Sequence, residues 1–305
     1  MGFAVDLRHV RLLSWLAAAL YVHLRGSVRL RPLRQLLDPT TFLAPYNAAM
    51  YLASAVPRGP FLRVDRLPEL AKLRAAWRTL RDEALALGAA TRGLGDGAGA
   101  EDLAFHTFFK RGWSRFHLKW YGAPLPSAEA ACPRTVALLR EIPTVRAALF
   151  CVLPPGGRLG RHRDPFAGVL RYHLGLATPN SDACVLHVDG APYSWRDGED
   201  ALFDETFVHE AWNGADAPRV VFFADVERPL RTAPMRALNR WVCRRVMPAA
   251  AARNAPDEAV GALNRVFGAY RAAAAAGRRF KAKTRVGYYA AKYAALALLA
   301  WALIF

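Results

Sequence analysis

The chain has 305 residues, of which 53% are hydrophobic and 22% charged, and its 42 Lys and Arg against 25 Asp and Glu give a formal net charge of +17. This length suffices for one large domain or two smaller ones, and the composition excludes a disordered chain. The absence of repeated long apolar runs excludes a polytopic transporter, and four cysteines without CxxC spacing exclude a disulfide-rich fold and favour a reducing compartment.

The N-terminal part combines an apolar run with a basic flank. Residues 12–22 are almost entirely apolar, and residues 1–34 contain six arginines against Asp6 alone. Because a bilayer span needs about 20 apolar residues, this shorter run either crosses with its polar ends reaching the interface or lies in the interface. We predict an N-terminal membrane anchor with a basic collar at residues 1–34; a core or amphipathic helix is the alternative.

Residues 35–227 are nearly neutral, with 21 Lys and Arg against 22 Asp and Glu. The uncharged stretch 42–56 is either a core helix or a segment that dips into the membrane. Residues 67–87 have apolar side chains at helical spacing and predict an amphipathic helix. The small residues of 88–100 predict a loop, and 133–140 a short helix.

The pattern then changes to short runs of β-branched and aromatic residues, separated by turns rich in Gly, Pro, Asp and Asn. Such runs are typical of an antiparallel sandwich or barrel. The runs are residues 147–153, 169–176, 183–188 and 219–226. We therefore expect a β domain with N-terminal helical elements at residues 35–230.

The C-terminal part mirrors the N-terminal one. Residues 231–285 are Ala- and Arg-rich and predict a basic helical region, and 286–305 form an apolar stretch of the length of a bilayer span. We predict a transmembrane or membrane-anchoring helix there, with an amphipathic or core helix as the alternative. Basic residues on the central side of both apolar segments place the β domain in the cytoplasm by the positive-inside rule. The excess charge borders apolar segments, so we expect an anionic membrane surface as partner and no nucleic acid.

The β region contains a His-x-Asp sequence at His162 and Asp164. Side chains at i and i+2 of an extended segment project to the same side, so this pair can offer an imidazole and a carboxylate to one metal ion. His209 follows later and can complete the two-His, one-carboxylate triad of non-haem Fe(II) oxygenases. The alternative for Asp164 is a loop salt bridge with a neighbouring arginine.

Arg219 opens a β run ten residues after His209. A guanidinium binds a carboxylate through two parallel hydrogen bonds, so Arg219 suits a dicarboxylate cosubstrate such as 2-oxoglutarate; the alternative is an edge-strand arginine facing water. Arg171 and His173 form another i, i+2 pair that faces one side, which we expect to be the cavity. The alternative for His173 is a core histidine that is hydrogen-bonded to the backbone.

In order and spacing, residues 113–229 resemble the aspartyl/asparaginyl β-hydroxylase family of Fe(II)- and 2-oxoglutarate-dependent oxygenases. The segments that carry the resemblance are CVLPPGGRLGRHRDPFAGVLRYHLGL, LFDETFVHEAWN and PRVVFFADVERP. The N-terminal segments YVHLRGSVRL and RQLLDPTTFLAPYNAAMYLASAVP resemble a bacterial branch that 2-hydroxylates lipid A. The resemblance implies a double-stranded β-helix, the jelly-roll or cupin-like core of a mainly β fold, with apolar membrane-associated helices at both termini.

The resemblance also implies roles for single residues. His162, Asp164 and His209 become iron ligands, and Arg219 binds the distal carboxylate of 2-oxoglutarate. The other cosubstrate-site positions are Arg171, His173 and Trp113. Cys151 stands where the peptide hydroxylases of the family have a cosubstrate-binding serine, so this contact departs from the family pattern.

The implied activity is hydroxylation of C2 of a secondary acyl chain of lipid A, or of its precursor, with Fe(II), 2-oxoglutarate and O2. It implies an enzyme of the bacterial inner membrane, with no protein partner expected. Three alternatives remain: a peptide aspartyl/asparaginyl β-hydroxylase, a basic nucleic-acid-binding protein, and a non-catalytic jelly-roll module. The joint presence of the triad and Arg219 disfavours the last.

Overall fold

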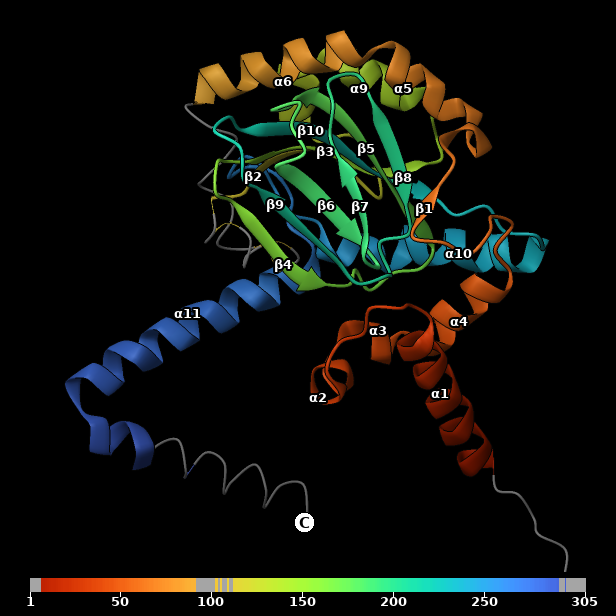
Figure 1. Ribbon diagram of the computed structural model, residues 1–305. Helices are drawn as coiled ribbons and strands as arrows, with labels where there is room; N and C mark the ends of the chain where they lie inside the picture. Colours follow the sequence, from red (N-terminus) through yellow and green to blue (C-terminus); the bar gives the residue numbers. More distant parts are fainter. Residues whose placement is uncertain are drawn as a thin grey trace, which may run out of the picture.

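A β core surrounded by helices makes up the body of the molecule (Figure 1). The computed structural model describes residues 7–91, 102–103, 105, 109, 112–290 and 294. The prediction of a mainly β core with flanking helices is confirmed.

The strands of the described residues form two antiparallel sheets, one of six strands in the order β1-β8-β5-β10-β3-β2 and one of four in the order β4-β9-β6-β7. From β3 to β10 the chain passes back and forth between the sheets, with the order of a jelly roll. The strand bounds are β1 (Phe61–Leu62), β2 (Ser114–Trp120), β3 (Val145–Leu153), β4 (Arg158–His162), β5 (Val169–Ala177), β6 (Cys184–Val188), β7 (Ala191–Ser194), β8 (Asp200–Phe203), β9 (His209–Asn213) and β10 (Arg219–Glu227).

Strand β10 is buried on both faces, because helices cover one face of the six-stranded sheet and the second sheet covers the other. Phe222 and Ala224 pack toward the helices, whereas Val221 and Phe223 pack between the sheets. The period of two that separates these sets also directs the charged residues of β10 and β5 into the space between the sheets.

Helices α5 (Ala71–Ala75), α6 (Trp77–Thr91) and α9 (Pro133–Arg140) cover the six-stranded sheet, with α8 (Pro126–Ala131) beside them. The helix predicted at 133–140 is confirmed. The helix predicted at 67–87 is present over most of that range but is divided. A 3-10 turn occupies Pro68–Leu70 and the helix breaks at Ala76, after which Trp77 packs against Gly198. Helix α6 also runs into the predicted loop 88–100, the rest of which lies outside the described residues.

We call residues 7–56 the N-terminal arm. It contains α1 (Leu7–Leu24), α2 (Pro32–Leu36), α3 (Pro39–Phe42) and α4 (Ala44–Leu52). Helix α1 projects away from the body in Figure 1, and exposed leucines run along it: Leu7, Leu12, Leu13, Leu16, Leu20 and Leu24. In contrast, α4 packs on the body, where Met50 is fully buried with Ala167 and Leu230. Of the two options for residues 42–56, the structure therefore shows the core helix.

Among the described residues, no helix is both long and apolar enough to cross a bilayer. Helix α1, which contains the predicted run at residues 12–22, also includes Arg8, Arg11 and His23. Most of the predicted C-terminal segment, residues 286–305, lies outside the described residues.

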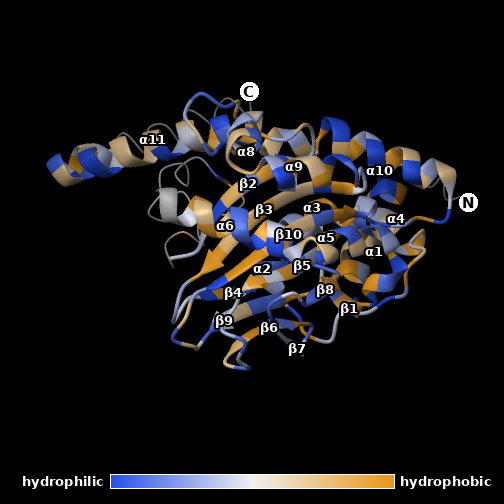
Figure 2. Ribbon diagram, turned by 90° about the horizontal axis from the view of Figure 1, so that it is seen from above, coloured by the Kyte–Doolittle hydropathy of each residue, from blue (hydrophilic) through white to orange (hydrophobic). Residues whose placement is uncertain are grey.

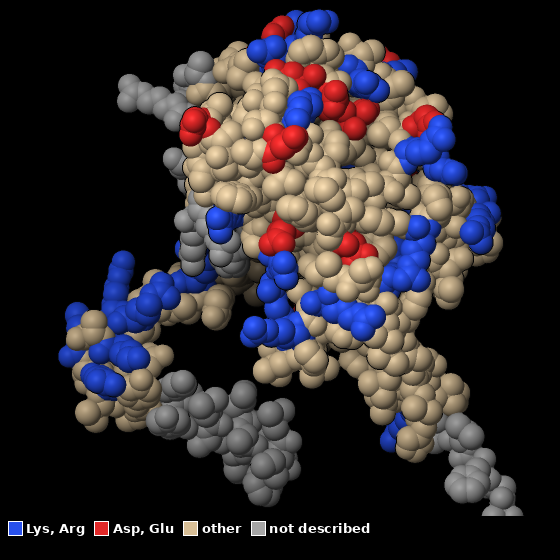
Figure 3. All heavy atoms as spheres, viewed as in Figure 1, with Lys and Arg blue, Asp and Glu red and all other residues tan. Residues whose placement is uncertain are grey.

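The basic region after the β core is helical, as expected. It forms α10 (Ala233–Arg245), a 3-10 turn at Met247–Ala250 and α11 (Ala262–Lys283). Figure 2 shows hydrophilic and hydrophobic residues alternating along α10 and α11. On the face seen in Figure 3, acidic and basic groups mix over the upper body, whereas the charged groups on α11 and at the lower edge, near α1, are Lys and Arg.

Gly175 of β5 permits a close approach that supports the cavity described below. A Cβ atom there would lie 2.0 Å from the backbone oxygen of Arg196, and a backbone atom cannot move aside cheaply. We expect Gly175→Ala to lower the free energy of unfolding by about 1–3 kcal/mol, measured by denaturant titration. Gly88→Ala in α6 is the control, because its Cβ meets nothing within 4 Å; equal losses in both variants would refute the steric explanation.

Candidate metal centre

The extended backbone around residue 163 brings His162 and Asp164 to one side, as the sequence predicted. His209 begins β9 and pairs with His162 of β4 in the four-stranded sheet. The candidate ligand atoms of His162, Asp164 and His209 all lie within 4.8 Å of one another, and the two imidazole centroids are 4.2 Å apart. The structure thus brings the three predicted ligands together.

Both imidazoles are oriented through their second nitrogen. His162 Nδ1 donates to the backbone oxygen of Gly160 at 2.7 Å, and His209 Nδ1 donates to that of Phe207 at 3.0 Å. A proton held on Nδ1 leaves the lone pair on Nε2, which is how metal-binding histidines are usually fixed. Burial, with the neighbouring His162, lowers the pKa of His209 to about 3, so this imidazole is neutral and suited to a metal at neutral pH.

Asp164 is held by an arginine. Arg171 Nη2 lies 3.1 Å from Asp164 Oδ2, and the same guanidinium contacts Glu205 and Asp225. Burial alone would raise the pKa of Asp164, but Arg171 and the two histidines outweigh it and keep the pKa below its usual value. Arg171 therefore lines the cavity as predicted, and its ion pair orients the carboxylate of Asp164, a predicted metal ligand.

Arg219 is a buried cation for which the described residues offer no carboxylate within ion-pair distance. Its side chain is 2% exposed, lies over the Trp195 ring with Cζ 4.2 Å from the centroid, and reaches only Cys151 Sγ, at 3.9 Å. Its Nε has no hydrogen-bond partner. A buried charge without a partner is costly, so this position favours an anionic ligand.

His173 presents a second donor to the same cavity. Trp195 Nε1 donates to His173 Nδ1 at 3.3 Å, which places the proton of the ring on Nε2. This Nε2 is buried and has no partner among the described residues. Burial and the nearby arginines hold the pKa of His173 well below its usual value, so it is neither a cation nor the backbone-bonded core histidine of the alternative.

One cavity between the sheets joins all the predicted site residues. Its walls are Phe105, Trp113, Cys151, Leu159, His162, Asp164, Arg171, His173, Leu186, Trp195, Phe203, His209, Ala211, Arg219 and Phe223. The candidate metal ligands, the guanidinium of Arg219, which has no carboxylate partner among the described residues, and the aromatic walls thus face a single space. A divalent metal and a small dicarboxylate fit this set of donors.

Trp195 and two of the acidic partners of Arg171, Glu205 and Asp225, were not predicted from the sequence. Trp195 follows β7, a strand that was not predicted, so the direction of the Trp195 side chain could not be inferred from the sequence. The sequence did indicate the position of Asp225. It lies an even number of residues from Arg219 within one β run, so both side chains project from the same face of the strand.

Comparisons with known proteins agree with this chemistry. The family model Aspartyl/Asparaginyl beta-hydroxylase matches residues 74–229. The ornithine lipid ester-linked acyl 2-hydroxylase of Rhizobium tropici is 40% identical over 128 residues, which cover 42% of this chain and 45% of that protein. The human aspartyl/asparaginyl beta-hydroxylase is 31% identical over 174 residues, covering 55% of this chain and 22% of that protein.

The chain thus spans less than half the length of these two relatives. Among solved structures, a Cupin 2 conserved barrel domain protein from Salinispora arenicola aligns with a TM-score of 0.27 and 16% identity, covering 42% of this chain and 83% of that one.

Replacing Arg219 tests whether the cavity is built for an anion. In Arg219→Met we expect the metal-free protein to keep or raise its melting temperature, because an apolar side chain replaces a buried unpaired charge. We also expect 2-oxoglutarate to raise the melting temperature of the wild type but not of the variant. Arg196→Met, which removes an arginine paired with the exposed Asp182, is the control; equal stabilisation of wild type and Arg219→Met would contradict the assignment.

Proposed function

The chain belongs to the aspartyl/asparaginyl β-hydroxylase family, and from this premise we propose that it is an Fe(II)- and 2-oxoglutarate-dependent dioxygenase that hydroxylates C2 of a secondary acyl chain of lipid A. The proposal rests on one cavity that is lined both by three side chains able to hold one metal ion and by a buried guanidinium without a carboxylate partner among the described residues. A facial set of three ligands leaves coordination positions open for cosubstrates.

Each residue then has a physical task. His162, Asp164 and His209 hold Fe(II), and Arg171 keeps Asp164 ionised and oriented. Arg219 binds the distal carboxylate of 2-oxoglutarate, and the Trp195 ring under it fixes the plane of the guanidinium. The Nε2–H of His173 donates to an acceptor oxygen of the cosubstrate.

Bound iron and 2-oxoglutarate supply the oxidising chemistry that converts an unactivated C–H bond to C–OH. The atoms balance: one oxygen of O2 enters the new hydroxyl, the other enters succinate, and 2-oxoglutarate loses CO2. The chain contributes positioning and the exclusion of water, the latter through Phe203, Phe223 and Trp113, which are all buried.

Two features support a lipid substrate. The relative from Rhizobium tropici is named for 2-hydroxylation of a lipid acyl chain. In this chain, α1 exposes a row of leucines next to basic residues of the arm, a combination typical of helices that lie in an anionic membrane interface. We infer that the enzyme works at the cytoplasmic face of the bacterial inner membrane, on lipid A or its precursor.

A peptide aspartyl/asparaginyl hydroxylase is the second candidate. The human hydroxylase of that name matches a larger share of this chain than the lipid hydroxylase does, 55% against 42%. A peptide substrate gives no role to the exposed leucines of α1, which is why we place it second.

Mass spectrometry of lipid A from cells with and without the gene, grown in air, tests the substrate. We expect one added oxygen on a secondary acyl chain with the wild type and none with His209→Ala, because the variant loses a ligand of the metal. His187→Ala, a histidine on the neighbouring strand β6 outside the proposed triad, should retain hydroxylation. Unchanged lipid A together with 2-oxoglutarate turnover on a peptide would select the second candidate.

Vesicle binding tests the arm. We expect Leu13→Glu with Leu16→Glu to reduce sedimentation with vesicles of anionic phospholipid at least tenfold, because two exposed apolar contacts of α1 become charged and repel the surface. Leu85→Glu, at an exposed leucine of α6 on the opposite side of the body, should bind like wild type. Equal binding by all three proteins would rule out α1 as the docking element.

A further inference from the structure

The segment that carries His162 and Asp164 has a second face, and the N-terminal arm contacts it. Backbone groups of Arg161, Pro165 and Ala167 bond to residues of the arm. Arg34 of α2 donates to the backbone oxygen of Arg161 at 2.6 Å. The amide of Asn47 in α4 donates to the oxygen of Pro165 at 2.9 Å and accepts from the nitrogen of Ala167 at 3.0 Å.

Arg163 stands between His162 and Asp164 in the sequence, and its buried side chain contacts the end of α1. It is 5% exposed. Its Nη1 donates to the oxygen of Val22 and to Gln35 Oε1, both at 3.1 Å, and its Nη2 donates to the oxygen of His23 at 3.5 Å. Val22 and His23 belong to the last turn of α1, whose carbonyl groups lack helical partners and attract a cation.

The segment before His209 is held by the same end of α1. Arg25, directly after the helix, donates to Asp204 at 2.5 Å and to Thr206 at 2.9 Å, and its guanidinium lies 4.1 Å from the centroid of Phe207. The oxygen of Phe207 is the group that orients His209. A chain of direct contacts therefore leads from α1 to the third ligand.

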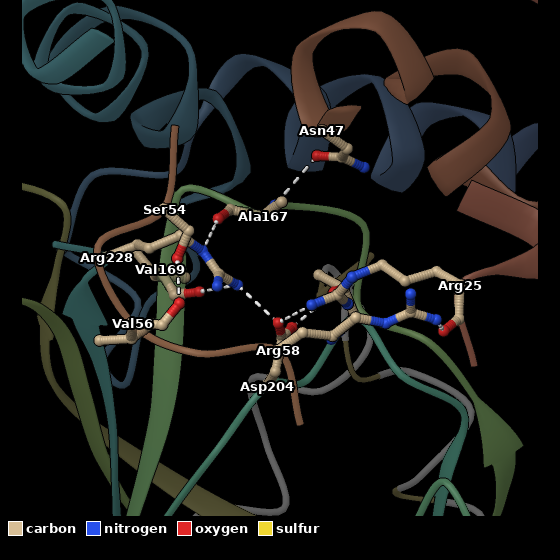
Figure 4. Close-up of polar contacts among 10 residues, drawn as sticks. Arg25, Asn47, Ser54, Val56, Arg58, Ala167, Val169, Asp204 and Arg228 are labelled. Atoms are coloured by element: carbon tan, nitrogen blue, oxygen red, sulfur yellow. Dashed lines mark hydrogen bonds and ion pairs between the residues drawn. The ribbon is translucent and has the colours of Figure 1, made fainter. Parts of the chain in front are cut away.

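Figure 4 shows the contacts that complete this arrangement. Arg228 approaches Asp204 from the side opposite Arg25, with Nη2 2.9 Å from Oδ2, and its Nε donates to the oxygen of Ala167 at 2.5 Å. Burial would raise the pKa of Asp204, but Arg228 and Arg25 outweigh it and lower the pKa. Asp204 thus stays ionised. Through Arg228 it links the turn before His209 to Ala167, in the segment after Asp164.

We propose that Arg163 and Arg25 are positioning residues of the metal centre, through which the N-terminal arm sets the relative placement of the His162–Asp164 segment and His209. The arm is then part of the metal site and not only a means of attachment. This inference rests on the proposed function, since it requires that the triad binds a metal.

Metal affinity measured on the folded, metal-free full chain in detergent tests the proposal, with Co(II) as the probe. Isothermal titration calorimetry gives the dissociation constant, and the visible absorption of bound Co(II) reports the ligand geometry. We expect Arg163→Met to weaken Co(II) binding about tenfold or more, as removal of groups that orient metal ligands does, and to alter the spectrum. Arg25→Met should have the same direction of effect.

Arg161→Met is the matched control. Arg161 also adjoins His162, but its side chain is exposed and pairs with Glu210, so affinity and spectrum should remain those of the wild type. Arg163→Lys keeps the charge and loses the forked hydrogen bonds, and should recover part of the affinity. It also serves if Arg163→Met fails to fold, which thermal unfolding without metal would reveal.

Wild-type affinity and spectrum in folded Arg163→Lys and Arg25→Met would overturn the proposal. A different result separates it from the proposed function. If the wild type binds Co(II) no better than His209→Ala does, the triad is not a metal site, and the proposed function fails together with this inference.

Discussion

The alternation of side chains along residues 162–164 organises this molecule. One set of side chains forms the metal cluster with His209, and the other set, with the intervening backbone groups, bonds to the N-terminal arm. A shift of one residue would exchange the two faces, placing Arg163 in the cluster and His162 against α1. The many hydrogen bonds on the arm side fix this register and thereby fix which residues meet the metal.

The same period explains how much of the site could be predicted from the sequence. His162 with Asp164 and Arg171 with His173 are pairs at i and i+2, so their shared direction followed from local geometry alone. The contact between Arg171 and Asp164 could not be predicted, because it depends on β5 lying beside the loop that follows β4. Trp195 and the bonds of Arg163 to α1 depend on tertiary contacts between distant segments in the same way.

Secondary-structure elements with a strong hydrophobic pattern could be predicted from the sequence, whereas their boundaries were harder to predict. The strand run at residues 219–226 corresponds to β10 (Arg219–Glu227) because it is apolar on both faces and bounded by Pro and Asp residues. The helix expected at 67–87 is divided at Ala76, next to Trp77, which packs against Gly198 in the loop after β7. Hydrophobic periodicity does not indicate such a contact between distant segments. For α1 the sequence predicted the apolar surface, and the structure shows it as a row of exposed leucines.

The buried end of α1 has a practical consequence for anyone who wishes to obtain the β core by itself. Cutting away residues 1–34 would remove the carbonyl groups of Val22 and His23 from Arg163 and would remove Arg25 from its ion pair with Asp204. The truncated protein would then expose a cation and a set of polar atoms without partners beside the proposed metal ligands. Solubility is better sought by exchanging the outward leucines of α1 for polar residues, which leaves the inner end of the helix intact.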